Sequence, residues 1–149
     1  MSSSKDLTDR LSQESTPTNG TLVSFDVVGL FPSVPLGPTV QYALKLLRHV
    51  NVNALLIKEF ADLLDVCLMN NICLFKSKIY KFPEGIGVPI GSPLGSLMGE
   101  LFMDLLESVV LDPGNPLTGH VLYWYRYVDD VLCLWGGGRG RFTSLFNNP

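Results

Sequence analysis

Two adjacent carboxylates, Asp129 and Asp130, interrupt an aromatic and apolar stretch, YWYRYVDDVLCLW at residues 123–135. The aromatic and β-branched residues on both sides predict two strands joined by a tight turn that carries the acids. Two ionised side chains next to each other repel, so a cation is expected near them. Carboxylate oxygens suit Mg²⁺, which keeps several waters and shares its shell with substrate phosphates. The alternative is that Asp-Asp only forms the turn.

A third acid, Asp26, lies within the apolar run TLVSFDVVGL at residues 21–30, which predicts a strand. Desolvating an unpaired charge costs several kcal/mol. Asp26 should therefore be paired or bound to a cation, or else lie at the strand end and cap a turn. The segment FPSVP at residues 31–35 predicts a rigid extended turn, because each proline fixes its own φ and restricts its predecessor.

The residues between the two predicted acidic strands suggest helices and a second hairpin. Helical spacing predicts one helix starting at Pro38 and another capped by Asn53. Alternation in ICLFKSKIYKF, residues 72–82, predicts a hairpin that turns at Lys76–Lys78. The hairpin carries three lysines, Lys76, Lys78 and Lys81. They could contact a nucleic-acid backbone, or they could simply keep the protein surface soluble.

A Gly/Pro-rich loop at residues 85–94 leads into a strongly periodic helix. Its backbone N–H groups could approach a phosphate or a base, although an ordinary loop is the alternative. The buried stripe of the helix should comprise Leu94, Leu97, Met98, Leu101, Phe102, Leu105 and Leu106. Short helices are also expected near Leu7–Leu11 and over Arg139–Phe146.

Composition limits the class of protein. A chain of 149 residues with 46% apolar content suits one domain with a real core. No uncharged apolar run is long enough to span a bilayer, and the N-terminal residues do not resemble a signal peptide. Three cysteines without CxxC spacing favour an intracellular chain with buried thiols. A net charge of −3 argues against a free-standing nucleic-acid binder, which normally presents a basic face.

Three motifs, in this order, resemble the palm of reverse transcriptases, most closely those of Penelope-like retroelements. They are SFDVVGLFPSVPL at residues 24–36, GVPIGSPLGSLMGELFMDLLE at residues 87–107, and YVDD at residues 127–130, which is similar to the YxDD box. The resemblance covers residues 22–135. Two features depart from the family. Gly95-Ser96 stands where relatives usually have a Ser-Pro pair after the loop, and Ile90 stands where many relatives carry Gln, although Penelope-like members often have an apolar residue there.

The resemblance implies an α+β polymerase palm, with an antiparallel sheet carrying the aspartates and helices packed on one face. It implies RNA-directed DNA polymerase activity by two-metal nucleotidyl transfer, with two Mg²⁺ ions or, alternatively, Mn²⁺. The catalytic residues would be Asp26, Asp129 and Asp130. The metal ligands would be Asp26, the Val27 carbonyl and Asp129, with Asp130 shaping the electrostatics of the site. The nucleotide-binding residues would be Phe31, Gly91, Ser92, Pro93 and Tyr127.

Phe31 would be the gate that excludes a ribose 2′-hydroxyl, or else a simple core residue. Residues 1–20 would form a polar N-terminal segment and residues 21–149 a partial palm that lacks fingers and thumb. The implied partners are an RNA template, a DNA primer and dNTPs, without a membrane and with a longer polypeptide of the same element left open. The implied location is intracellular, in the nucleus.

Two alternatives remain open at this stage. The chain could be a catalytically inactive, truncated retroelement remnant that at most binds metal or nucleic acid. It could also be an α+β protein–protein interaction domain with an accidental Asp-Asp pair, for which no Mg²⁺ dependence is expected.

Overall fold

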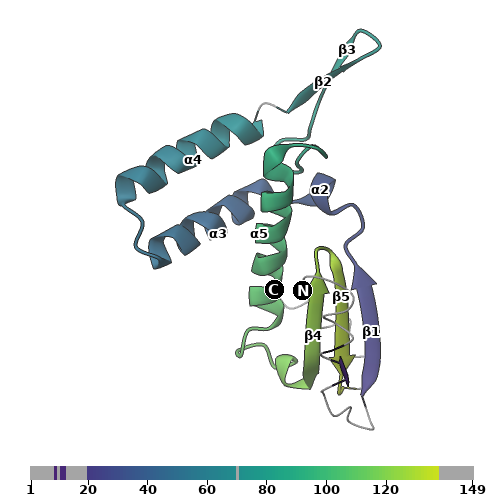
Figure 1. Ribbon diagram of the computed structural model, residues 1–149. Coiled ribbons are helices and arrows are strands. Elements are labelled where there is room, and N and C mark those ends of the chain that lie inside the picture. Colours follow the sequence, from purple (N-terminus) through teal and green to yellow (C-terminus); the bar gives the residue numbers. More distant parts are fainter. Residues whose placement is uncertain (1–8, 10, 13–19, 70, 138–149) are drawn as a thin grey trace. The chain divides into compact units, whose positions relative to one another are not determined.

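A computed structural model describes residues 9, 11–12, 20–69 and 71–137 (Figure 1). The predicted α+β class is confirmed, because the described chain combines α-helices with antiparallel sheets. The chain divides into two compact units, one of residues 1–28 and 106–149 and the other of residues 29–105. The expected helix near Leu7–Leu11 lies largely outside the described residues, and the one over Arg139–Phe146 lies entirely outside them.

The first unit contains a three-stranded antiparallel sheet in the order β1-β5-β4 (Figure 1). β1 spans Thr21–Asp26, β4 spans Val121–Tyr127 and β5 spans Asp130–Trp135. The 3₁₀ turn η1, Thr118–His120, leads into β4. The predicted hairpin of residues 123–135 is thereby confirmed. The first strand is shorter than predicted and ends at Asp26, because the chain turns at Gly29 with φ +62°.

One face of this sheet forms the core of the first unit. Cys133 and Trp135 of β5 are fully buried together with Val110, the last residue of helix α5 (Pro93–Val110). Residues 106–110 of α5 belong to this unit. Partly buried neighbours complete the cluster; they are Val23, Phe25, Leu106, Leu111, Leu117, Val121 and Trp124. Since side chains alternate along a strand, Asp26 and Asp130 lie on the opposite face of the sheet.

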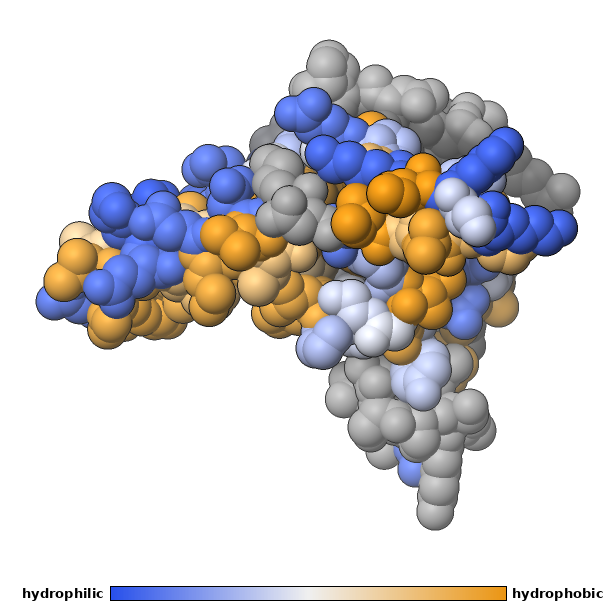
Figure 2. Space-filling view, turned by 90° about the horizontal axis from the view of Figure 1, so that it is seen from above, coloured by the Kyte–Doolittle hydropathy of each residue, from blue (hydrophilic) through white to orange (hydrophobic). Residues whose placement is uncertain are grey.

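The second unit contains α2 (Leu30–Ser33), α3 (Leu36–His49), α4 (Ala54–Met69) and α5 as far as residue 105. It also contains the predicted hairpin, with β2 at Ile72–Phe75 and β3 at Lys78–Lys81. The Asn53 cap is confirmed, since its Oδ1 accepts the N–H of Leu55 at 2.8 Å. Figure 2 shows hydrophilic residues, in blue, and hydrophobic residues, in orange, side by side on the surface at the left of the view.

Three local predictions in the second unit are wrong, the first only in part. The extended turn predicted for residues 31–35 is confined to its end: residues 31–33 belong to the one-turn helix α2, which follows the left-handed Gly29, whereas Val34 has φ −59° and ψ 120° and Pro35 is extended. Helix α3 begins at Leu36 rather than Pro38, and the Pro35 carbonyl accepts both the N–H and the hydroxyl of Thr39. In α5, the predicted buried Leu97 is 46% exposed, whereas Met103 is fully buried. None of the described helices has the length and apolarity needed to span a bilayer.

Candidate metal and nucleotide site

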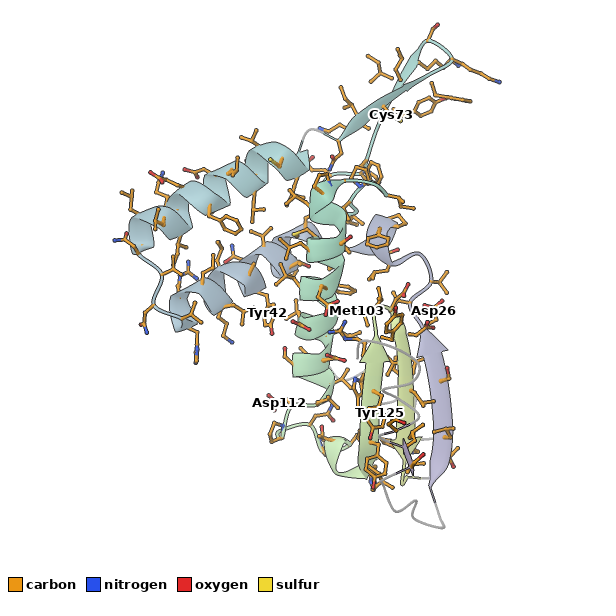
Figure 3. All side chains as sticks on the ribbon, in the orientation of Figure 1. Asp26, Tyr42, Cys73, Met103, Asp112 and Tyr125 are labelled. Atoms are coloured by element: carbon orange, nitrogen blue, oxygen red, sulfur yellow. The ribbon has the colours of Figure 1, made fainter. Side chains whose placement is uncertain are left out.

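Asp26 and Asp130 lie directly opposite each other, where β1 ends and β5 begins (Figure 3 marks Asp26). Opposite residues of an antiparallel pair project from the same face, with Cβ atoms about 4.5–5.5 Å apart. Both side chains are exposed. Within the described part of the chain, no cationic side chain forms an ion pair with either of them. The two negative charges therefore repel, and a cation bound between them would relieve the repulsion.

Asp129 occupies the two-residue turn between β4 and β5 and is half-buried. The other turn residue, Val128, has φ +56°, whereas Asp129 does not have a positive φ. A positive φ at the first turn residue is the pattern of a type II′ hairpin, which usually has glycine there. For a β-branched residue this backbone is strained, and such strain persists only where the surroundings impose it.

A polar network on the core face of β4 holds this turn. Arg126 Nη1 donates to the Val128 carbonyl at 3.1 Å, and Arg126 Nε donates to Glu107 Oε1 at 2.9 Å. Trp124 Nε1 donates to the same Glu107 oxygen at 2.7 Å. The Arg126 and Glu107 side chains are 12% and 22% exposed, so water screens their interaction only partly. Glu107 thus binds two side chains of β4, those of Trp124 and Arg126. Arg126 in turn binds the backbone of the strained turn.

Glu107 and Arg126 are not among the site residues predicted from the sequence. The sequence did contain an indication of this ion pair. Strand alternation places Arg126 on the same face as Trp124, and a charged side chain that faces a core needs a partner of opposite charge. The partner could not be found from sequence, because Glu107 lies 19 residues away, on a helix.

The face of β4 opposite the core carries three tyrosines, of which the last, Tyr127, lies next to the acids. Tyr123, Tyr125 and Tyr127 alternate along the strand, and Tyr127 is the cross-strand partner of Asp130. The rings of Tyr123 and Tyr125 are stacked, with centroids 6.3 Å apart and planes at 19° (Figure 3 marks Tyr125). Tyr127 is 48% exposed. A row of phenol rings therefore leads along one strand to the carboxylates.

The carboxylates suit a metal that is only partly held by protein. Among the residues that the structure describes, no group of three or more His, Cys, Asp or Glu side chains is arranged to hold a metal ion. Mg²⁺ does not need such a cage, because it is usually bound by one or two carboxylates together with waters and substrate phosphates. The facing, exposed Asp26 and Asp130, with Asp129 in the adjoining turn, fit this kind of site. Val27, whose carbonyl was a predicted ligand, directly follows Asp26.

The predicted nucleotide-binding residues of the second unit gather around the start of α5. The Phe31 ring is half-buried, and a Cβ atom placed on Gly99 would lie 3.2 Å from Phe31 Cε1. Ser92 Oγ accepts the N–H of Leu94 at 3.3 Å and caps α5, and Pro93 is the first helical residue. Gly91 has φ +90° and open space around it.

Backbone hydrogen bonds attach the glycine loop to the segment that carries Phe31. The Val88 N–H donates to the Phe31 carbonyl at 2.8 Å, and the Gly87 N–H donates to the Val34 carbonyl at 2.8 Å. Gly87 has φ +86°, and a Cβ atom there would lie 2.7 Å from the Pro32 carbonyl oxygen. Glycine is therefore needed at position 87 for both backbone conformation and space.

The structure brings Asp26, Tyr127, Asp129 and Asp130 together in the first unit. In the second unit it brings Phe31 and Ser92 to the same glycine, since a Cβ atom on Gly95 would lie 3.9 Å from each of them. Comparison of the chain with protein-family models, curated proteins and solved structures found no match. A functional assignment therefore depends on the residues and their geometry.

Proposed function

We propose that the chain is the palm of an RNA-directed DNA polymerase and extends a DNA primer with dNTPs on an RNA template. The observation that carries the proposal is the facing pair Asp26 and Asp130, with Asp129 beside them in a strained turn. The order of the three sequence motifs supports it, as does the location of the acids on the sheet face opposite the core.

Asp26, the Val27 carbonyl and Asp129 would hold two Mg²⁺ ions. When bound, these ions activate the primer 3′-hydroxyl and neutralise the triphosphate and the leaving pyrophosphate. Asp130 contributes negative charge opposite Asp26 and orders water around the site. Arg126 and Glu107 hold the turn in place, so Asp129 is already in position before substrate binds. Phe31 would face the sugar of the incoming nucleotide.

Primer extension on an RNA template, with Mg²⁺ and dNTPs, tests this proposal. Asp26→Ala and Asp129→Ala should abolish nucleotide addition with the fold intact, and Asp130→Ala should lose less. Asp65→Ala is the matched control, because Asp65 is an exposed carboxylate of α4. Normal incorporation by Asp26→Ala or Asp129→Ala would overturn the assignment. Binding of Mg²⁺ without extension by the unsubstituted chain would favour the non-catalytic remnant.

A further inference from the structure

The β2–β3 hairpin exposes large apolar side chains along both strands. Five of them are between 50% and 73% exposed; they are Ile72, Leu74, Phe75, Ile79 and Tyr80. Figure 3 shows the side chains of β2 and β3, with Cys73 marked, extending outward from both sides of the hairpin. A two-stranded hairpin is marginally stable in water by itself, and a continuous apolar surface usually marks an interaction site.

The two faces of the hairpin differ in chemistry. The register pairs Phe75 with Lys78 and Cys73 with Tyr80. Opposite residues share a face, so one face, here the aromatic face, comprises Cys73, Phe75, Lys78 and Tyr80. The other, the aliphatic face, comprises Ile72, Leu74, Ile79 and Lys81.

Positive charge accompanies the aromatic face. Residues 71–82 contain three lysines and no Asp or Glu, in a chain whose net charge is −3. Lys76 and Ser77 both have positive φ, at +47° and +61°, as in a type I′ turn. The ammonium group of Lys76 lies 5.4 Å from the centroid of the Phe75 ring. Two cations, Lys76 and Lys78, therefore lie next to exposed aromatic rings.

We propose that the aromatic face binds single-stranded nucleic acid, with bases stacked on Phe75 and Tyr80 and phosphates near Lys76 and Lys78. Phe75 and Tyr80 are diagonal neighbours, for which separations of roughly 7–8 Å are typical, so each ring can accept its own base. Exposed aromatic rings interleaved with cations form the usual platform for single strands. An acidic peptide would use the lysines but would not require two exposed rings. If the chain has the proposed polymerase function, the bound strand would be the RNA template. The binding of a single strand does not depend on that function.

Fluorescence anisotropy of labelled oligouridine and oligothymidine with the full chain, at several salt concentrations, measures this binding. Phe75→Leu and Tyr80→Leu keep an apolar side chain but remove the ring, and each should weaken binding about five- to 150-fold. The double variant Lys76→Gln/Lys78→Gln should reduce the slope of log K against log salt by about 1.4, or about 0.7 for each phosphate contact. Ile72→Ala and Leu74→Ala, on the aliphatic face, are the matched controls and should bind normally.

The outcomes separate this inference from the polymerase assignment. Asp26→Ala and Asp129→Ala should bind the oligonucleotides as the unsubstituted chain does, so activity can be lost while binding remains. The proposal would be overturned if the chain did not bind the oligonucleotides at low salt. It would also be overturned if aromatic-face and aliphatic-face variants, each with the circular dichroism spectrum of the unsubstituted chain, lost equal amounts of oligonucleotide affinity. Binding of polyglutamate at the same strength, without dependence on either ring, would also overturn it and assign the hairpin to an acidic protein partner.

Discussion

Asp26, the last residue of β1, and Asp130, the first residue of β5, are cross-strand partners in an antiparallel sheet. Like charges in this position destabilise a sheet, whereas opposite charges stabilise it. The Glu107–Arg126 pair behind the same hairpin is instead matched in charge and joined by a 2.9 Å hydrogen bond. The core face of the hairpin thus pairs its charges, whereas on the other face neither Asp26 nor Asp130 has a cationic partner among the described residues, and a divalent cation would neutralise their charge.

The first prediction follows from this repulsion. Without divalent ions, Asp130→Asn should raise the free energy of unfolding by roughly 0.5 kcal/mol, because it removes one of two facing charges. Mg²⁺ should stabilise the unsubstituted chain against urea and should stabilise the variant less, since a ligand of the native state shifts the folding equilibrium. Asp65→Asn, on α4, is the control and should respond to Mg²⁺ as the unsubstituted chain does. An equal effect of Mg²⁺ on all three proteins would contradict a metal site at this pair.

The second prediction concerns the network that holds the turn. Arg126→Met leaves the half-buried Glu107 carboxylate with Trp124 as its remaining described donor, and should cost about 2–3 kcal/mol of unfolding free energy. Adding Glu107→Gln should recover part of this loss, because a neutral amide can still accept the Trp124 N–H. Urea denaturation of both single variants and the double variant gives the coupling energy.

The exposed pair Lys58 and Asp62 provides the control for that cycle. Their side chains are 73% and 67% exposed, although the Nζ to Oδ2 distance is also 2.9 Å. Screening by water should keep the effect of Lys58→Met under about 0.5 kcal/mol. A loss of unfolding free energy for Arg126→Met as small as that for Lys58→Met would show that the network does not hold the turn.

Local pattern predicted much of the fold. Alternation and turn residues located both hairpins, and helical periodicity together with Asn53 located α4. The acids of the candidate site were also found, because carboxylates are conspicuous in apolar strands. The pairing of Asp26 with Asp130 could not be obtained this way, since register is set by how two distant strands meet. The same limit hid the Glu107–Arg126 pair and the left-handed Gly29 that begins α2.

A third prediction concerns the sugar of the nucleotide. If Phe31 faces it, Phe31→Val should admit ribonucleotides in primer extension, because the smaller side chain leaves space for a 2′-hydroxyl. Phe31 also packs against Gly99, so the variant should lose about 1–3 kcal/mol of stability whether or not it is a gate. The informative quantity is therefore the ratio of dNTP to rNTP incorporation, with Phe82→Val as a control for loss of a partly buried aromatic ring. An unchanged ratio would leave Phe31 as a packing residue only.

The fourth prediction concerns the buried thiol of the sheet core. Burial raises the pKa of Cys133 from its usual value near 9 to about 11. Between these values the unfolded state loses the proton while the native state keeps it, so stability should be unaffected below pH 9 and should fall above it. The loss should reach roughly 2–3 kcal/mol by pH 11, at 1.36 kcal/mol for each pKa unit.

Two measurements check the behaviour of this thiol. The unfolding free energies of Cys133→Ala and of the unsubstituted chain can be compared from pH 7 to pH 11. The variant should not show the fall in unfolding free energy above pH 9 that comes from the Cys133 thiol. Thiol labelling at pH 8 should modify the exposed Cys67 and Cys73 in the native protein and Cys133 only after unfolding. Rapid native labelling of Cys133 would show that the β5 core is open to solvent.

The fifth prediction contrasts two glycines of one loop that share a left-handed backbone, with φ +86° at Gly87 and +90° at Gly91. Gly91→Ala meets open space and should cost only the backbone strain, about 1–2 kcal/mol. Gly87→Ala adds a Cβ atom 2.7 Å from the backbone oxygen of Pro32, in a segment whose Phe31 and Val34 carbonyls accept the N–H groups of Val88 and Gly87. Its cost should rise to about 2–5 kcal/mol. Urea denaturation compares the two variants directly, and equal losses would mean that the loop is not attached to the Phe31 segment as described.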